Sequence, residues 1–124
     1  MRQSEAIRFV IEIEVSDVDA FKALVQQAVA ISREEPGTVV YDWYLDEATG
    51  KCRLYEAYET LEALRAHVKG RVFTEVGPKL LQVCEFVRVD AFGEVPPGAK
   101  ERPGIAPTTW WDAPFAAVSA AKTK

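Results

Sequence analysis

The fold is decided by residues 38–58, which read TVVYDWYLDEATGKCRLYEAY. Residues 38–45 and residues 52–58 are rich in β-branched and aromatic side chains, which is typical of strands. The polar segment 46–51 between them contains Gly50, which can adopt the positive φ of a tight turn. These residues therefore predict a β-hairpin.

Upstream of the hairpin, apolar and charged residues alternate over residues 6–15, which predicts a strand. One face of this strand carries Ile7, Phe9 and Ile11, and the other face carries both charged and apolar side chains. Apolar residues at helical spacing then predict an amphipathic helix over residues 17–34. A strand and a helix therefore precede the hairpin.

Capping residues locate the starts of the two main helices. Ser16 and Asp19 form a capping-box pattern ahead of the first helix. Thr60 is the expected cap of a second helix over residues 61–70. Pro36 follows the first helix and is expected to stop it. Each helix thus has a predicted boundary.

Two further elements complete the pattern. Residues 72–81 predict a short helix interrupted at Gly77, and residues 82–92 predict a last strand. The order β-α-β-β-α-β is the ferredoxin-like arrangement. We therefore expect an α+β fold with a four-stranded antiparallel sheet that carries its helices on one face.

The predicted sheet has bulky side chains on both faces. The strand at residues 38–45 carries Tyr41 and Trp43 on one face and Val40 and Tyr44 on the other. Soluble monomers seldom expose a large apolar patch. A second copy packed face to face in a closed twofold dimer would cover it. We therefore expect a homodimer.

The chain has 124 residues, which fits one domain with a single core. Residues 1–91 are predicted to form that domain, and residues 92–124 a C-terminal extension that holds five of the seven prolines. Trp110 and Trp111 are uncommon in a disordered tail. We expect the extension to dock partly, on its own domain or on the partner's, and residues 119–124 to fray.

Composition excludes several classes of protein. The net charge of −4 and the absence of a basic cluster argue against nucleic acid or an anionic membrane as partner. The N-terminal residues form neither a signal peptide nor a membrane span, so a cytoplasmic location is expected. Cys52 and Cys84 are expected to be buried thiols, with a disulfide or a catalytic thiol as alternatives. Two Cys and one His make a structural zinc site unfavourable, and no Gly-rich phosphate loop supports a nucleotide or flavin.

Three stretches together resemble the antibiotic biosynthesis monooxygenase (ABM) family, namely EPG at 35–37 followed by VVYDWY, YEAYETLEALRAH at 55–67, and Phe73 followed by GPKLL at 77–81. Glu56 and His67 match a strand Glu and a helix His of that family. The resemblance covers residues 6 to about 90. It implies a dimer whose two sheets form an α+β barrel, and enzymes that oxidise polycyclic phenols, anthrones or quinols with dioxygen without metal or flavin. Members of the same fold that degrade haem or isomerise small molecules show that the fold does not fix the function.

The candidate catalytic residue is His67, the only histidine of the chain. It is suited to act as a general acid or base, or as a hydrogen-bond donor to a phenolate. The alternative is a structural histidine bonded to Glu56 or to the backbone. Glu56 would orient His67, or would form a structural ion pair with Arg53 or Arg65.

The candidate substrate-binding residues are Tyr41, Trp43, Phe73 and Glu56. Flat aromatic walls suit a flat aromatic ligand, and a Tyr hydroxyl or a Trp N–H can bind a ketone or phenolate oxygen. By strand alternation, Tyr41 and Trp43 line the pocket together or not at all. Phe73, like Trp110 and Trp111 of the extension, either covers the pocket as a lid or packs as an ordinary apolar side chain.

These residues lead to two main hypotheses. The first is a monooxygenase without metal or other cofactor that acts on a quinol-like or polycyclic aromatic phenol, with His67 as the base. The second is a non-catalytic dimer that binds a small ligand or serves a stress-related role, with His67 packed or solvated. A small-molecule isomerase is a third possibility. A pocket that touches His67 and two aromatic side chains would favour the enzyme.

Overall fold

The computed structural model describes residues 6–118. The strands and helices follow the predicted order β-α-β-β-α-β, and four short elements are added to it. The elements are β1 (Ile7–Val15), α1 (Val18–Ser32), β2 (Thr38–Asp46), β3 (Lys51–Tyr58), α2 (Leu61–Val68), the π-helical turn η1 (Val72–Val76), α3 (Gly77–Leu80), β4 (Cys84–Gly93), the 3-10 turn η2 (Ala99–Glu101) and β5 (Thr108–Trp111).

The hairpin that decided the prediction is present. Strands β2 and β3 pair antiparallel, with Asp46 opposite Lys51 at the turn. Gly50 in that turn has φ of +77°, as its sequence context required. The predicted break in residues 72–81 falls at Gly77, where the π-helical turn gives way to α3.

The sheet has one strand more than predicted. Its order is β2-β3-β1-β4-β5, and the first four strands are antiparallel as expected. The fifth strand lies parallel to β4, so the sheet is mixed. The chain after β4 turns back along the sheet before β5 begins, and the backbone N–H of Val89 donates to the carbonyl of Pro107 at 2.9 Å. Only four residues long, β5 has too little periodicity to be predicted.

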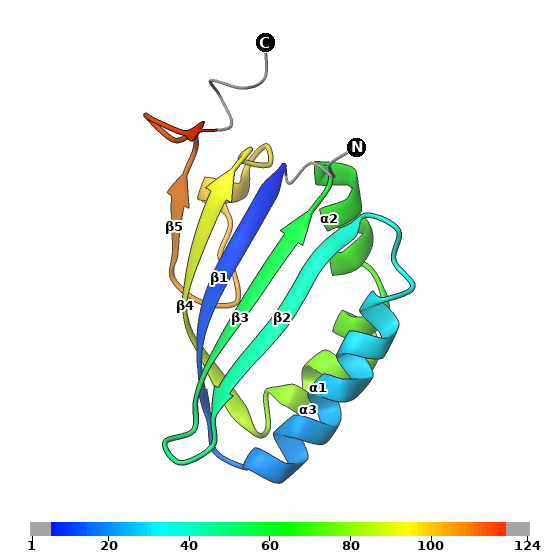
Figure 1. Cartoon of the computed structure of the whole chain (residues 1–124). Helices are drawn as coiled ribbons and strands as arrows, with labels where there is room; N and C mark the ends of the chain where they lie inside the picture. The colour runs from blue at the N-terminus through cyan, green and yellow to red at the C-terminus, as the bar shows by residue number, and fades with distance from the viewer. Residues whose placement is uncertain (1–5, 119–124) are drawn as a thin grey trace.

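The three α-helices cover one face of the sheet (Figure 1). The core lies between them and the side chains that alternate inward from the strands, among them Ile11, Ile13 and Leu54, each at most 4% exposed. From α1, Phe21 and Val25 complete this layer. Burial of such side chains supplies most of the driving force for folding.

The first helix begins one residue later than predicted. Asp17 rather than Ser16 is its N-cap, and Asp17 Oδ1 accepts a hydrogen bond from the backbone N–H of Ala20 at 3.1 Å. The backbone N–H of Ser16 instead donates to the carbonyl of Val83 at 2.8 Å, which holds Ser16 at the sheet. The prediction for the second helix is confirmed, because Thr60 Oγ1 accepts from the N–H of Ala63 at 3.0 Å.

The opposite face of the sheet is more polar than its sequence suggested. Tyr44 and Trp111 are 61% and 53% exposed. Strand β4 contributes an ion pair between Arg88 and Asp90 to this face, with 2.6 Å between Nη2 and Oδ2. This face therefore combines exposed aromatic rings with charges.

Both cysteines are free and buried, as predicted. Burial raises the pKa of the Cys52 thiol and of the Cys84 thiol to about 11, which keeps both protonated near neutral pH. They act as small apolar members of the core. None of the helices described between residues 6 and 118 is long and apolar enough to cross a bilayer.

Candidate active site

A pocket of about 280 Å³ lies between the sheet and the helices. All five residues predicted for the site line it, namely His67, Tyr41, Trp43, Glu56 and Phe73. Its other lining residues are almost all apolar: Ile11, Leu54, Val72, Gly77, Pro78, Leu80, Leu81, Phe86 and Ile105. The sequence-based condition for an enzyme, a pocket that touches His67 and two aromatic side chains, is therefore met.

Strand alternation brings the predicted residues together. Tyr41 and Trp43 lie on the helix-facing side of β2, and their rings pack edge to face with 5.6 Å between centroids. Trp43 also packs against Phe21 of α1, which fixes the side of the sheet it occupies. In β3, Glu56 lies directly opposite Tyr41. Tyr41 and Trp43 therefore line the pocket together, as their spacing along the strand required.

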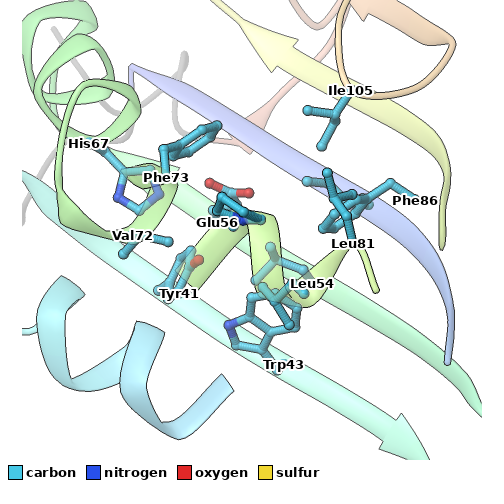
Figure 2. A pocket seen from close by; sticks show the side chains of 14 residues that line it. Tyr41, Trp43, Leu54, Glu56, His67, Val72, Phe73, Leu81, Phe86 and Ile105 are labelled. Atoms are coloured by element: carbon cyan, nitrogen blue, oxygen red, sulfur yellow. The ribbon is translucent and has the colours of Figure 1, made fainter. Parts of the chain in front are cut away.

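The helical side of the pocket comes from α2 and η1. Figure 2 shows His67 and Phe73 on one side of the pocket, across from Phe86 and Ile105. The π-helical turn at Val72–Val76 widens the helical path and begins two residues after Gly70. It places Phe73 beside His67, with 5.6 Å between ring centroids.

His67 is only 2% exposed and is paired with Glu35. The distance between His67 Nδ1 and Glu35 Oε1 is 2.7 Å. An ionised carboxylate only accepts hydrogen bonds, so the hydrogen is assigned to Nδ1. The neutral ring then has a free lone pair on Nε2, for which no described residue is a hydrogen-bond partner. This arrangement is that of a histidine base oriented by a carboxylate.

The partner carboxylate is itself held in place. Thr38 Oγ1 donates a hydrogen bond to Glu35 Oε1 at 2.8 Å. The rings of Tyr41 and Tyr58 both lie 5.2 Å from the His67 ring, between centroids. The orientation of the imidazole is therefore fixed by its hydrogen bond to Glu35 and by aromatic contacts on several sides.

Glu56 does not form the couple with His67 that the sequence suggested. Its Oε1 accepts a hydrogen bond from the hydroxyl of Tyr58, two residues along the same strand face. The proposed ion pairs with Arg53 and Arg65 are also wrong, because Arg53 donates to the carbonyl of Cys52 and Arg65 is exposed on α2. Glu56 faces the core, away from these cations, because strand alternation separates it from Arg53.

Burial sets the protonation state of the polar groups in the pocket. Burial raises the pKa of the Glu56 carboxyl above its usual range, and the hydrogen bond from Tyr58 and the proximity of His67 only partly oppose this. Burial, together with the nearby Glu56 charge, raises the pKa of the Tyr41 hydroxyl far above its usual value. Tyr41 therefore stays a hydrogen-bond donor near neutral pH. Trp43 Nε1 is a second donor, buried and without a hydrogen-bond partner among the described residues.

Two residues of the site were not singled out from the sequence: Glu35, which bonds to His67 from outside the pocket lining, and Ile105, which lines the pocket. Glu35 stood within the EPG stretch that carries the family resemblance, but its role as the partner of His67 was not predicted. Ile105 reaches the pocket from the C-terminal extension. Of the two tryptophans considered as lids, Trp111 stacks on Phe92, with 6.4 Å between centroids, and Trp110 packs edge to face on Phe9.

The fold and the site together define a class: a ferredoxin-like α+β protein with a buried histidine–carboxylate pair facing an aromatic pocket. The family model described as antibiotic biosynthesis monooxygenase matches residues 6–77. The chain therefore belongs to the ABM family.

Several solved structures share this fold. MupZ from Pseudomonas fluorescens is 18% identical, with a TM-score of 0.69 over 91% of this chain and 95% of its own. SnoaB from Streptomyces nogalater, a cofactor-independent oxygenase, is 15% identical, with a TM-score of 0.62 over 75% of this chain and 96% of its own. A structure described as an antibiotic biosynthesis monooxygenase is 21% identical, with a TM-score of 0.60 over 73% of this chain and 99% of its own. A comparison with curated protein sequences found no match.

The two named structures differ in how much of this chain they cover. Residues 1–91 make up less than three quarters of the 124 residues, so a match over 91% must include part of the C-terminal extension. The match to SnoaB covers 75% of this chain, which is close to the share that residues 1–91 make up by themselves. The fold shared with MupZ therefore includes at least part of residues 92–124.

Proposed function

We propose that this protein is a monooxygenase without metal or organic cofactor that oxidises a quinol-like or polycyclic aromatic phenol with dioxygen. The observation that carries the proposal is the His67–Glu35 pair, whose unpartnered Nε2 belongs to a pocket of aromatic and aliphatic side chains. Membership in the ABM family supports it. The fold shared with SnoaB, a cofactor-independent oxygenase, is consistent with it.

The proposed oxidation requires a base and a pocket that excludes water, rather than a bound metal or organic cofactor. His67 Nε2 removes a proton from the electron-rich substrate, and Glu35 stabilises the imidazolium that forms. The substrate carbanion transfers one electron to dioxygen, and the two radicals combine into a peroxide. The protonated peroxide loses water and leaves a carbonyl, so that a CH₂ group and O₂ become C=O and H₂O. One oxygen atom enters the product and the other leaves as water.

The remaining pocket residues bind and orient the substrate in this proposal. The Tyr41 hydroxyl, protonated at neutral pH, would donate a hydrogen bond to the phenolate oxygen where negative charge develops. Trp43 provides a flat wall and an unpaired N–H donor. Phe73, 41% exposed, would cover the ring and limit the entry of water.

We further propose that the protein acts as a homodimer in the cytoplasm. The sheet face opposite the helices exposes Tyr44 and Trp111, and a second copy would bury them. Two buried free thiols agree with a reducing compartment. Sedimentation equilibrium measures the oligomeric state, and a monomer at micromolar concentration would contradict this part of the proposal.

Oxygen uptake tests the enzymatic proposal. Wild-type protein should consume dioxygen in the presence of an anthrone or a hydroquinone, and His67→Ala should lower the rate by roughly 10²–10⁴-fold, the usual contribution of a general base. Equal uptake by both proteins would remove His67 from the chemistry. Binding of the anthrone without any uptake by the wild type would favour the non-catalytic ligand-binding protein instead.

A further inference from the structure

A second hollow, of about 300 Å³, adjoins the pocket already described. We call the first pocket the inner lobe and this hollow the outer lobe. The two lobes share the lining residues Ile11, Glu56, His67, Phe73 and Ile105. The outer lobe therefore begins at the candidate base and extends away from the Tyr41 and Trp43 wall.

The C-terminal extension forms one wall of the outer lobe. Residues 96–110, here called the strap, contribute Pro96, Arg102 and Trp110 to it, and α2 contributes Leu64 and Val68 from the other side. Figure 2 shows Ile105 reaching from the strap toward the inner lobe. Without the strap, this hollow would be an open part of the sheet surface.

We propose that the two lobes form one binding site, and that its ligand is an elongated aromatic molecule whose far end carries a carboxylate bound by Arg102. This inference rests on the proposed function, because it places the reacting ring of that substrate in the inner lobe. Among the described residues 6–118, Arg102 is the only Lys or Arg whose side chain lines either lobe. A guanidinium binds a carboxylate through two parallel hydrogen bonds.

The charge of Arg102 is unused within the described part of the chain. Its guanidinium has no ion pair or hydrogen bond with any residue between 6 and 118, whereas the neighbouring Lys100 pairs with Asp112, with 3.6 Å between Nζ and Oδ1. Glu56, the one carboxyl of the described residues that lines the lobes, has its pKa raised by burial and so competes weakly for a cation. The Arg102 guanidinium is therefore available to bind an anionic group of a ligand.

The backbone leaves room for the guanidinium. Gly98 has φ of +77°, a conformation that other residues rarely adopt. A Cβ atom at this position would lie 2.7 Å from Arg102 Nη1. The glycine therefore lets the arginine side chain fold back against the start of η2, next to the outer lobe.

The strap is fastened to the sheet at its far end. Strand β5 pairs with β4, and Trp110 packs edge to face on Phe9 with 6.3 Å between ring centroids. The prolines of the strap restrict the unfolded chain and lower the entropic cost of ordering it. A preorganised wall of this kind loses little freedom when a ligand binds.

The size of the lobes agrees with an elongated ligand. Pockets for drug-sized ligands span roughly 300–1,000 Å³, so each lobe alone stands at the lower limit. Joined past Phe73 and Ile105, the lobes accommodate a ring system in one and a substituent in the other. An anion near Arg102 then fixes which end of the ring system faces His67.

The test uses two product-like probes of equal size, an anthraquinone carboxylate and the corresponding carboxamide, in isothermal titration calorimetry. Wild-type protein should bind the carboxylate about tenfold more tightly than the carboxamide, as one charge-assisted contact at a partly exposed site provides. Arg102→Gln should abolish the difference while leaving the affinity for the carboxamide unchanged. Lys100→Gln is the matched control, because Lys100 belongs to the same turn but does not line the outer lobe, and it should keep the tenfold preference.

The outcomes separate this inference from the function on which it rests. Equal affinities of the wild type for both probes would overturn the role of Arg102 and leave the monooxygenase proposal intact. An unchanged preference in Arg102→Gln, with an unchanged melting temperature, would do the same. If neither probe binds, while an anthrone still supports oxygen uptake, the two-lobe site is wrong; if uptake is absent as well, both proposals fail.

Discussion

The candidate site contains two carboxylates in different surroundings. Glu35, between α1 and β2, keeps 20% of its side chain exposed and accepts hydrogen bonds from His67 and Thr38. Glu56, in β3, is 8% exposed and accepts a hydrogen bond from Tyr58. The difference teaches that access to water and the nature of the partner, rather than the residue type, decide which carboxylate assists a base and which is driven toward its neutral form.

Among changes at these two carboxylates and their partners, the largest effect is expected when Glu35 loses its charge. Glu35→Gln removes the anion that stabilises the protonated His67 during proton abstraction. Oxygen uptake with an anthrone should fall by about 10²–10³-fold, within the range for an impaired general base. The loss should appear in kcat more than in KM, because Glu35 does not line either lobe.

Two further variants show whether this loss is specific. Glu35→Asp keeps the charge and should retain more activity than Glu35→Gln. Glu34→Gln alters the neighbouring, exposed carboxylate and should leave the rate unchanged. If Glu35→Gln retained full activity, the assignment of Glu35 as the positioning residue of His67 would be wrong.

A smaller effect, on stability, is expected at the second carboxylate. Tyr58→Phe removes the hydroxyl that donates to Glu56 and leaves a buried carboxyl without that partner. The free energy of unfolding should fall by about 1–3 kcal/mol, the cost of an unsatisfied buried polar group. Urea unfolding at neutral pH measures this change.

The control for this prediction is an exposed tyrosine. Tyr44→Phe removes a hydroxyl from a side chain that is 61% exposed, and its stability should stay within about 0.5 kcal/mol of the wild type. Similar stability changes in the two variants would show that the contact between Tyr58 and Glu56 contributes little.

The last expected effect is a pH-dependent gain in stability in Glu56→Gln. Because the pKa of Glu56 is raised in the folded protein, its favourable contribution is complete below the unfolded pKa of about 4.3 and is lost as pH rises through the folded value. Gln does not titrate and can still accept from Tyr58. The stability of the variant relative to the wild type should therefore increase as the pH rises from 4 to 8, as urea unfolding at several pH values would measure. A stability difference that is constant over this range would contradict the raised pKa.

Most of the fold could be predicted from local patterns. The alternation of apolar residues placed Tyr41 and Trp43 on one face, and the turn chemistry of Gly50 joined β2 to β3. The cap at Thr60 was also correct. The cap of α1 was predicted one residue early, because Ser16 and Asp17 both suit the position and only the observed hydrogen bond from the N–H of Ala20 to Asp17 Oδ1 distinguishes them.

The candidate site was predicted in its members but not in its connections. Each of the five residues faces the pocket because the period of its own strand or helix turns it inward. The partner of His67 lies 32 positions earlier in the chain, and no local pattern pairs it with a helix residue. Glu56 was the nearer choice on the strand, and it proved to be bonded to Tyr58.

The sequence by itself determined the order of the strands and helices and the inward face of each, because both follow from periodicities of two and 3.6 residues. Only the tertiary structure decided that Glu35 rather than Glu56 bonds to His67, that β5 adds a parallel edge to the sheet, and that the strap closes the outer lobe. These features depend on distances between separate elements. Such distances are set by how the elements pack, which a pattern within one segment does not encode.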